Sequence, residues 1–265
     1  MPESVPLSEL VSYLDAYLHV AEVPDDTEAL NGLQAESRSG HVTRVVAAVD
    51  ATLATIHSVI ERRPAGGPGK DCPLLVVHHG LFWDGNRPLT GRRYRRVRAL
   101  LDGDVAVYSA HIPLDVHPEV GNNHVLARAL GLSDLEPFDE YKGVPIGVQG
   151  ALSEPVSREH FVRRVEEHVG ASAKLIPGGP ERCARVGIIT GGAGGRIRAA
   201  HQAGLDTFVT GEGAHHTYFD AMELGVNAIY AGHYATETVG VKALAQHLST
   251  RYGLPWEFHD HPTGL

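Results

Sequence analysis

The chain has 265 residues, of which 43% are hydrophobic and 21% charged, and its formal net charge is −9. Such a composition is ordinary for a globular protein with a sizeable core and excludes a disordered chain. The acidic balance argues against nucleic-acid binding, which rests on Lys and Arg neutralising phosphates. Without an apolar leader or a membrane-spanning run, a cytoplasmic protein is expected. The two cysteines, Cys72 and Cys183, are too few for a disulfide framework and are expected to be reduced.

Strands and helices alternate in the first half of the chain. Apolar spacing predicts helices over 7–20, 51–63, 94–101 and from about 121 to 130, and strands over 42–50, 74–79 and from 105 onward. Residues 25–40 are expected to be loop, and a Pro/Gly-rich break is expected at 64–69. Strand, helix and strand at this spacing predict a βαβ unit in a mainly parallel sheet.

The second half begins with an expected irregular stretch over 131–147, which is the best candidate for a boundary. A helix is predicted over 157–170 with Ser157 as its N-cap, followed by strand, helix and strand over 185–190, 196–203 and 208–210, and a last strand from 228. These elements repeat the order of the first half.

An internal repeat is clearest where a strand ending His111-x-x-x-Asp115 aligns without a gap with one ending His233-x-x-x-Glu237. The expected fold is therefore α/β, with two lobes of similar α/β/α topology related by the repeat. The lobes are expected to span 1–130 and 131–265, and the C-terminal segment can pack back on the first. Ligands of open α/β sheets bind outside the carboxyl ends of strands, so a site is expected in the cleft between the lobes.

The residues at these strand ends form one chemical set of imidazoles and carboxylates: His78, His79, His111, Asp115, Glu212, His215, His216, His233 and Glu237. Without a thiolate, such a set suits zinc, iron, manganese or nickel. It is larger than one tetrahedral ion needs. A site for two ions with Asp115 or Glu237 as the bridge is therefore predicted.

Several of these residues have a plainer explanation that stays open. His111 could form a core hydrogen bond or orient Asp115, and Glu237 could be an ordinary carboxylate at a helix N-terminus. The pair at 215–216 could lie in a surface loop or in a substrate lid.

Two further motifs also have two interpretations. The glycine-rich stretch 191–195 follows a strand and precedes a helix, so it could hold a substrate phosphate or simply make a tight turn. The basic cluster Arg92-Arg93-Tyr94-Arg95-Arg96 with Arg98 is interpreted as a solvated helix face, with a local phosphate contact left open.

The combination of motifs resembles the YbgI-type (Nif-three-like) dinuclear metal-centre proteins, also labelled GTP cyclohydrolase 1 type 2 homologue. The resemblance runs from Asn31 to Phe258 and rests on four phrases: His78-His79-Gly80-x-Phe82-Trp83-x-Gly85, Leu114-Asp115-x-His117-Pro118-Glu119-x-Gly121-Asn122-Asn123, Thr210-Gly211-Glu212 and Gly232-His233-x-Ala235-Thr236-Glu237.

The resemblance implies two divalent ions per chain in a toroidal homohexamer. It implies the metal ligands His78, His79, Asp115, His233 and Glu237. Glu237, His111 and Glu212 are the acid–base or supporting candidates, and His215, Gly192 and Gly194 the substrate-binding candidates.

The implied activity is hydrolysis of a nucleotide-like small molecule, in which a metal-bound water opens the ring of GTP. Two alternatives stay open: a protein that binds or delivers metal without turnover, and a regulatory scaffold ring. No membrane partner is expected.

Overall fold

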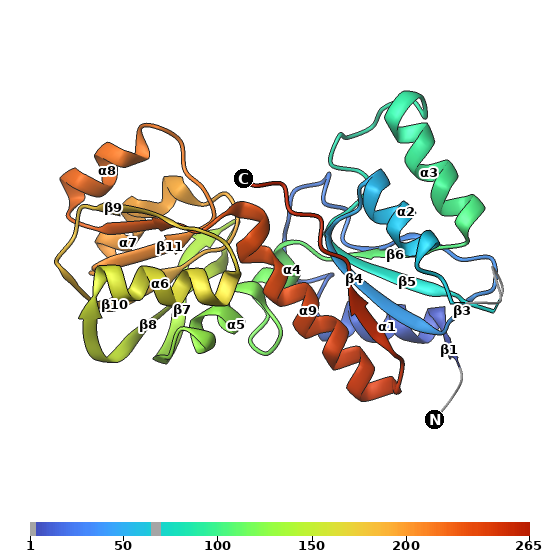
Figure 1. The fold of residues 1–265 in the computed structure, drawn as a ribbon, viewed down its shortest axis with the longest axis horizontal. Coiled ribbons are helices and arrows are strands. Elements are labelled where there is room, and N and C mark those ends of the chain that lie inside the picture. Colours follow the sequence, from blue (N-terminus) through green and yellow to red (C-terminus); the bar gives the residue numbers. More distant parts are fainter. Residues whose placement is uncertain (1–3, 65–69) are drawn as a thin grey trace. The chain divides into compact units, whose positions relative to one another are not determined.

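The computed structural model describes residues 4–64 and 70–265, and most of the break expected at 64–69 lies outside this range. The chain has a mixed α/β fold (Figure 1). It divides into two compact units, of which the first comprises 1–114 and 241–261 and the second 115–240 and 262–265. The lobe boundary expected between 130 and 131 stays a prediction.

The first unit is built around a sheet with strand order β13-β4-β5-β6-β2. Its strands and helices are β1 (Val5–Pro6), α1 (Leu7–Tyr17), β2 (Gly32–Ala35), β3 (His41–Val42), β4 (Arg44–Asp50), α2 (Leu53–Glu61), β5 (Pro73–His79), α3 (Gly91–Gly103), β6 (Ala106–Ser109) and β13 (Trp256–Phe258). Strands β13, β4, β5 and β6 pair in parallel, and β2 pairs antiparallel with β6. The predicted βαβ unit is thereby confirmed, and β1 and β3 form a separate antiparallel pair.

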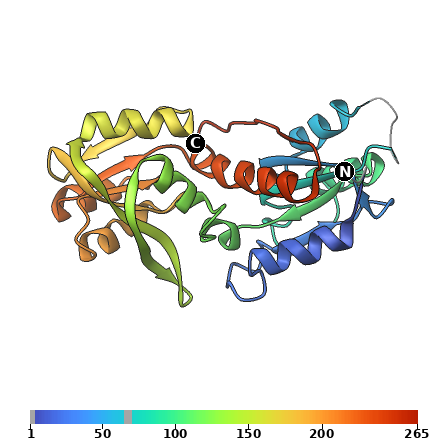
Figure 2. The ribbon, with the colours of Figure 1, turned by 90° about the horizontal axis from the view of Figure 1, so that it is seen from below.

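The apolar runs of β4, β5 and β6 place alternate side chains on opposite faces of the sheet. One face packs Val46, Leu75 and Val107 against Ile56 of α2 and Leu100 of α3. Helix α1 lies across the sheet from α2 (Figure 2). A hydrogen bond from the Tyr108 hydroxyl to Asp15, 2.8 Å long, holds α1 there.

A buried ion-pair network lies where β4 and β5 begin. Arg44 donates to both carboxylate oxygens of Asp71, at 2.7 and 3.1 Å, and to Glu257 of β13 at 2.6 Å. Arg63 donates to the same Asp71 at 3.0 Å. The side chains of Arg44, Arg63 and Asp71 are all less than a tenth exposed.

The second unit has the sheet order β7-β8-β10-β11-β12-β9. Its elements are α5 (Asn122–Ala129), β7 (Leu132–Tyr141), β8 (Val144–Ser157), α6 (Arg158–Val169), β9 (Lys174–Pro177), β10 (Arg182–Ile188), the 3-10 turn η1 (Gly194–Arg196), α7 (Ile197–Gln202), β11 (Thr207–Thr210), α8 (Thr217–Leu224) and β12 (Asn227–Tyr230). Strands β10, β11 and β12 pair in parallel, and β9 pairs antiparallel with β12.

Neighbouring residues of these strands again point to opposite faces. Val209 and Ile229 pack with Phe161 of α6, whereas Phe208 and Ala228 pack with residues of α7 and α8. The predicted cap of α6 is confirmed, because the Ser157 hydroxyl accepts the backbone N–H of His160. Two helices cross the limits of the units in sequence, namely α4 (Ile112–Asp115) and α9 (His233–Tyr252).

The expectation that 25–40 is loop is wrong, because these residues include β2. This strand has only four residues, and a register shift interrupts it between Leu33 and Ala35. Its pairing with β6 comes from the tertiary fold, since so short a segment has no resolvable alternation of its own. The strand expected from 105 is also shorter than predicted, and Asp115 lies at the end of α4.

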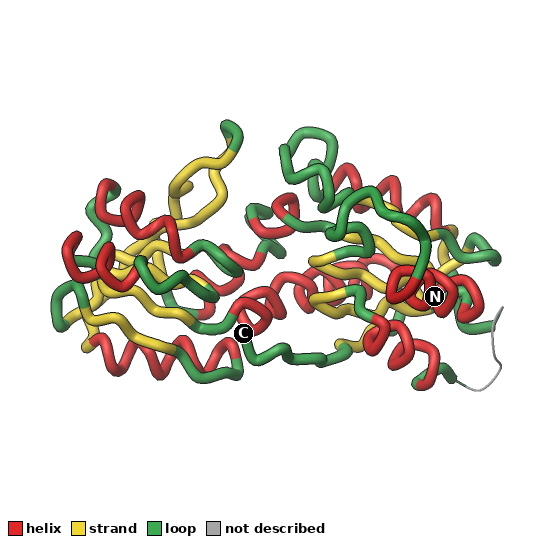
Figure 3. The backbone as a smooth tube through the Cα atoms, turned by 90° about the horizontal axis from the view of Figure 1, so that it is seen from above, coloured by secondary structure: helices red, strands yellow, loops and turns green. Residues whose placement is uncertain are grey.

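The expectation that 131–147 is irregular is likewise wrong. Strands β7 and β8 form a long antiparallel hairpin whose tip projects from its sheet (Figure 3). Pro137 and the positive φ angles of Asp134 and Asp139 obscure the pattern in the sequence. Because β7 is an edge strand, a proline there removes no necessary ladder hydrogen bond.

Both cysteines are buried and unbonded to each other. Burial raises the pKa of the Cys183 thiol to about 11. In the described part of the chain, no helix combines the length and the apolar character that crossing a membrane requires.

Candidate metal centre

The predicted histidine pair lies at the carboxyl end of β5, in the middle of the first sheet. His78 is fully buried, and its Nδ1–H donates to the carbonyl oxygen of Ala110 at 2.9 Å. The Nδ1–H of His79 donates to Asp50 Oδ1 at 2.9 Å, and Asp50 is the residue opposite His79 in the β4–β5 register. The strand register thus supplies the carboxylate that orients His79.

His111 follows β6, the neighbouring strand, and is held by a segment that the sequence assigned to loop. Its Nδ1–H donates to Asp25 Oδ1 at 2.9 Å, and its backbone N–H donates to Asn31 Oδ1 at 2.7 Å. Asp25 Oδ2 also accepts the Asn31 amide and the backbone N–H of Ile112, each at 2.9 Å. Burial alone would raise the pKa of Asp25, but the hydrogen bond and charge of His111 and the other donors hold it below its usual value.

The three imidazoles of the first unit come together as a group that can bind a metal. His78, His79 and His111 each offer a ring nitrogen within 4.8 Å of the others. Carbonyl and carboxylate oxygens only accept hydrogen bonds, so each Nδ1 carries a proton, and a ring in its neutral form then keeps its lone pair on Nε2. Oxygen partners at Nδ1 are the usual support of histidines that ligate a metal through Nε2. The donor set therefore fits a divalent ion.

The indole of Trp83, four residues after His79, packs edge-on against two of these rings. Its ring centroid lies 4.7 Å from that of His111 and 5.6 Å from that of His79. This contact fills the space beside the imidazoles with an apolar surface.

The second unit collects carboxylates around a single imidazole at the start of α9. His233 Nε2 lies 3.2 Å from Glu237 Oε1, one helical turn further on, and Glu212 Oε1 accepts the Nδ1–H of His233 at 2.8 Å. Glu237 is 2% exposed. The hydrogen bond with Glu237, opposed by burial and aided by both negative charges, raises the pKa of His233 to about 9. A buried carboxylate is costly unless a positive charge offsets it, and here the imidazole of His233 does so in part. A divalent ion can supply the same compensation.

Asp115 is positioned by neighbours from two other elements. Its Oδ1 accepts the side-chain amide of Asn122 at 2.8 Å and the hydroxyl of Thr190 at 3.3 Å. Asn122 in turn accepts the backbone N–H of Gly240 in α9 at 2.7 Å. These two donors fix the direction of one carboxylate oxygen without adding a positive charge beside it.

The glycine-rich loop after β10 lies directly against the carboxylates of Glu237 and Glu212. A Cβ at Gly191 would lie 2.3 Å from Glu237 Oε1, and one at Gly194 would lie 2.4 Å from the Cα of Gly213. Gly191 also has a φ of +69°. The close approach of the backbone explains the glycines at these two positions.

The backbone N–H groups of the same loop are partly used within the protein. The N–H of Gly194 donates to the Glu212 carbonyl at 3.0 Å, and that of Ala193 donates to the Thr210 hydroxyl at 3.1 Å. Gly192 is exposed, and a Cβ there would lie 3.5 Å from Glu212 Oε1. Binding of a substrate phosphate by Gly192 and Gly194 stays a prediction.

His215 and His216 are exposed in the loop before α8. The ring of His215 lies edge-on to that of Phe219, with 5.7 Å between their centroids. This placement agrees with a surface loop, and a role as a substrate lid stays a prediction.

Several supporting residues were absent from the predicted site. Asp50 could have been found, because it ends the strand that the βαβ unit places beside His79. Asp25 could not, since nothing local marks a residue that meets its partner 86 positions further along the chain.

Nearly the whole chain matches a known protein family. Residues 5–262 match Duf34/NIF3 (NGG1p interacting factor 3). The chain belongs to the Duf34/NIF3 family. Relatives within it include a protein of Deinococcus radiodurans and one of Pyrococcus abyssi, 44% and 41% identical, each named GTP cyclohydrolase 1 type 2 homolog. The alignments cover 97% of this chain in both cases, and 94% and 98% of the relatives.

Solved structures of the Duf34/NIF3 family share the fold over nearly the whole chain. TTHA1606 of Thermus thermophilus is 42% identical with a TM-score of 0.87, and the protein ybgI is 33% identical with a TM-score of 0.88. Each comparison covers 98% of this chain and 100% of the other. HcgD of Methanocaldococcus jannaschii, 22% identical with a TM-score of 0.82, shares the fold.

Proposed function

We propose that this protein is a dinuclear metal-dependent hydrolase that acts on a nucleotide-like small molecule. Its ligands would be His78, His79, Asp115, His233 and Glu237, and the ions zinc, iron, manganese or nickel. The observation that carries the proposal is the common orientation of three imidazoles, each with an oxygen acceptor at Nδ1. Nitrogen and carboxylate donors without thiolates suit these ions.

Two bound ions would supply Lewis-acid chemistry and lower the pKa of water for attack on the substrate. The protein's own residues would position the ions and handle protons. Glu212 accepts a hydrogen bond from His233 and has half of its side chain exposed, so it could pass a proton to or from solvent. Glu237 would serve as the bridging carboxylate, and His111 would act beside His78 and His79.

GTP is the first substrate to test, because relatives that cover nearly all of this chain are named GTP cyclohydrolase 1 type 2 homolog. That name belongs to those relatives, and ring opening of GTP by this chain is our proposal. His215, Gly192 and Gly194 are the proposed substrate contacts. The exposure of His215 and Gly192 leaves both accessible to a ligand from solution.

The decisive experiment measures bound metal and turnover on the same samples. Elemental analysis of the purified protein is expected to give two ions per chain, and metal-loaded protein is expected to release formate from GTP. His79→Ala should lose both properties. His168→Ala, an exposed histidine on α6, is the matched control and should keep both.

Three outcomes would contradict parts of the proposal. If the protein holds two ions per chain but turns over GTP and other nucleotides no faster than His79→Ala does, a protein that binds or delivers metal is favoured. Full metal content in His79→Ala would refute the ligand assignment itself. Salt-dependent binding to DNA would favour the regulatory scaffold, which the net charge of −9 opposes.

We also propose that the two units are related by the internal repeat and that the chain forms a homohexamer. The repeat is supported by strand order: β4-β5-β6 and β10-β11-β12 are both parallel, and each third strand has an antiparallel neighbour. Sedimentation equilibrium tests the assembly, which should have the mass of six chains of 28.5 kDa. A monomer or dimer at all concentrations would overturn it.

A further inference from the structure

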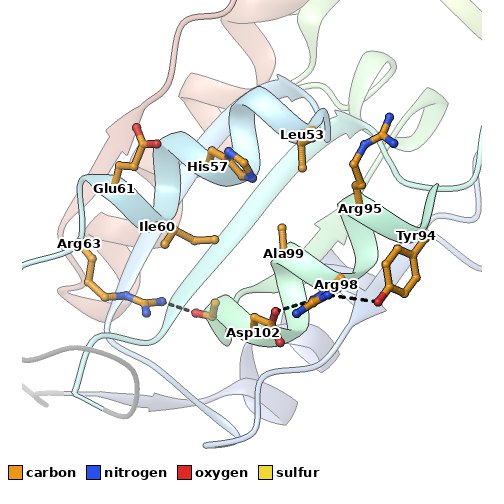
Figure 4. A pocket seen from close by; sticks show the side chains of 11 residues that line it. Leu53, His57, Ile60, Glu61, Arg63, Tyr94, Arg95, Arg98, Ala99 and Asp102 are labelled. Carbon is orange, nitrogen blue, oxygen red and sulfur yellow. Dashed lines mark hydrogen bonds and ion pairs between the residues drawn. The ribbon is translucent and has the colours of Figure 1, made fainter. Parts of the chain in front are cut away.

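A groove runs between α2 and α3 of the first unit, apart from the imidazole group. Its cavity has a volume of about 750 Å3 (Figure 4). Sites for small molecules typically measure about 300–1,000 Å3, so the groove is large enough for a ligand of this class.

The floor of the groove is apolar. Leu53 and Ile60 from α2 and Ala99 from α3 face the space between the two helices (Figure 4). All three are half-buried, and Ile60 and Ala99 also pack on the core beneath. When a ligand covers apolar side chains that were partly open to water, the free energy of the complex is lowered.

The wall contributed by α3 is positively charged. This helix contains five arginines and one acidic residue, Asp102. Arg92, Arg93 and Arg96 approach the single carboxylate of Asp84, at 3.5, 2.9 and 3.8 Å. Arginines at intervals of three or four residues on one helix repel each other by a few tenths of a kcal/mol per pair, roughly, in the absence of counter-charges.

The remaining two arginines line the groove. Arg98 forms an exposed ion pair with Asp102 at 3.1 Å and lies 3.3 Å from the Tyr94 hydroxyl. Arg95 is exposed at the end of the groove that Leu53 also lines (Figure 4), and it has no ion-pair partner among the described residues. A guanidinium beside an apolar floor is complementary to a ligand with an apolar body and an anionic head.

We propose that this groove binds a small amphipathic anion, with its apolar chain or ring on Leu53, Ile60 and Ala99 and its carboxylate or phosphate on Arg95. The basic cluster of α3 is thereby given a binding role beyond a solvated helix face. The site is independent of the proposed metal centre, since none of its lining residues is a proposed ligand.

The test uses the full-length, metal-loaded protein and anilinonaphthalene sulfonate, a fluorescent anion with an apolar body. Decanoate and decyl phosphate then compete for the groove and distinguish a carboxylate from a phosphate head. Arg95→Gln should weaken probe binding by about tenfold, as the loss of a charge-assisted hydrogen bond predicts. Arg92→Gln, on the same helix but directed at Asp84, should leave binding unchanged.

A second variant, Ala99→Leu, places a larger side chain on the floor and should abolish binding while thermal unfolding stays cooperative. Removing the metals with EDTA should leave probe binding unaltered. The proposal is overturned if Arg95→Gln binds the probe as well as Arg92→Gln, or if decanol competes as well as decanoate. Displacement of the probe by an acidic amphipathic peptide, but by neither decanoate nor decyl phosphate, would overturn it in favour of a protein partner.

Discussion

The first unit gathers imidazoles at its strand ends, and the second gathers carboxylates. In the first unit β4 ends at Asp50 and β5 at His79. The proposed repeat aligns Asp50 with Gly191 and His79 with Glu212. Asp50 orients His79, whereas Gly191 has no side chain and lets Glu237 approach its backbone. The same order of strands therefore presents imidazoles in one unit and mainly carboxylates in the other.

The two units differ in which residue type would bind the ions and in which residues hold it in place by hydrogen bonds. In the first unit the histidines face the proposed ions, and carboxylates such as Asp25 and Asp50 hold them. In the second unit Asp115 takes hydrogen bonds from the neutral side chains of Asn122 and Thr190. Neither of these two donors adds a positive charge beside Asp115, which suits a carboxylate proposed to bind a divalent cation.

The largest expected effect comes from removing the ligands of one unit at a time. The double variants His78→Ala with His79→Ala, and Asp115→Asn with Glu237→Gln, should each lose both ions, because the proposed centre needs ligands from both sets. Elemental analysis after dialysis measures this. One ion retained in either variant would show that the two units bind metal separately.

A second contrast concerns Arg44 and Arg185, which the proposed repeat aligns when residues 44–49 are matched to 185–190. Arg44 is buried in the network with Asp71 and Glu257, whereas Arg185 is exposed. Arg44→Ala should lower the free energy of unfolding by about 3–5 kcal/mol, as for a broken buried ion pair. Arg185→Ala should change it by less than about 0.5 kcal/mol, as at ordinary surface positions. Urea denaturation compares them, and equal effects would contradict the assigned burial.

Removing a carboxylate that orients an imidazole is expected to weaken metal binding less than removing the ligands themselves. Asp50→Asn keeps the size of the side chain but weakens the acceptor for His79, so metal affinity should fall by about 10–100-fold. Competition with a chelator of known affinity measures it. Asp102→Asn, in an exposed ion pair on α3, is the control and should leave metal affinity unchanged. An unaltered affinity in Asp50→Asn would mean that His79 is no ligand.

The smallest contrast separates backbone strain from contact with Glu237. Gly191 and Gly170 both have positive φ, +69° and +72°, but a Cβ at Gly170 would meet nothing within 4 Å. Gly170→Ala should therefore cost only about 1–2 kcal/mol of left-handed strain. Gly191→Ala should cost more and also weaken metal binding. Equal losses of stability in urea, with metal content retained, would remove Gly191 from the site.

The sequence predicted those parts of the fold and candidate site that depend on local pattern. The strand ending at His78-His79 and the cap at Ser157 could be predicted, because apolar runs and capping residues act over a few positions. Strand β2 and the partnership of Asp25 with His111 depend on segments distant in the chain. Pro137 concealed β7, since a proline is tolerated at a sheet edge for reasons invisible in the sequence.

The hydrogen bonds at Nδ1 of His78, His79 and His111 leave these rings little freedom to rotate. Little conformational entropy would then be lost when an ion arrives, so most of the interaction free energy would appear as affinity. An imidazole that cannot rotate presents its Nε2 atom in one fixed position. Competing metal ions must therefore replace one another at that position. Exchange of one ion for another would therefore proceed as substitution in a preformed site, without refolding of the strand ends.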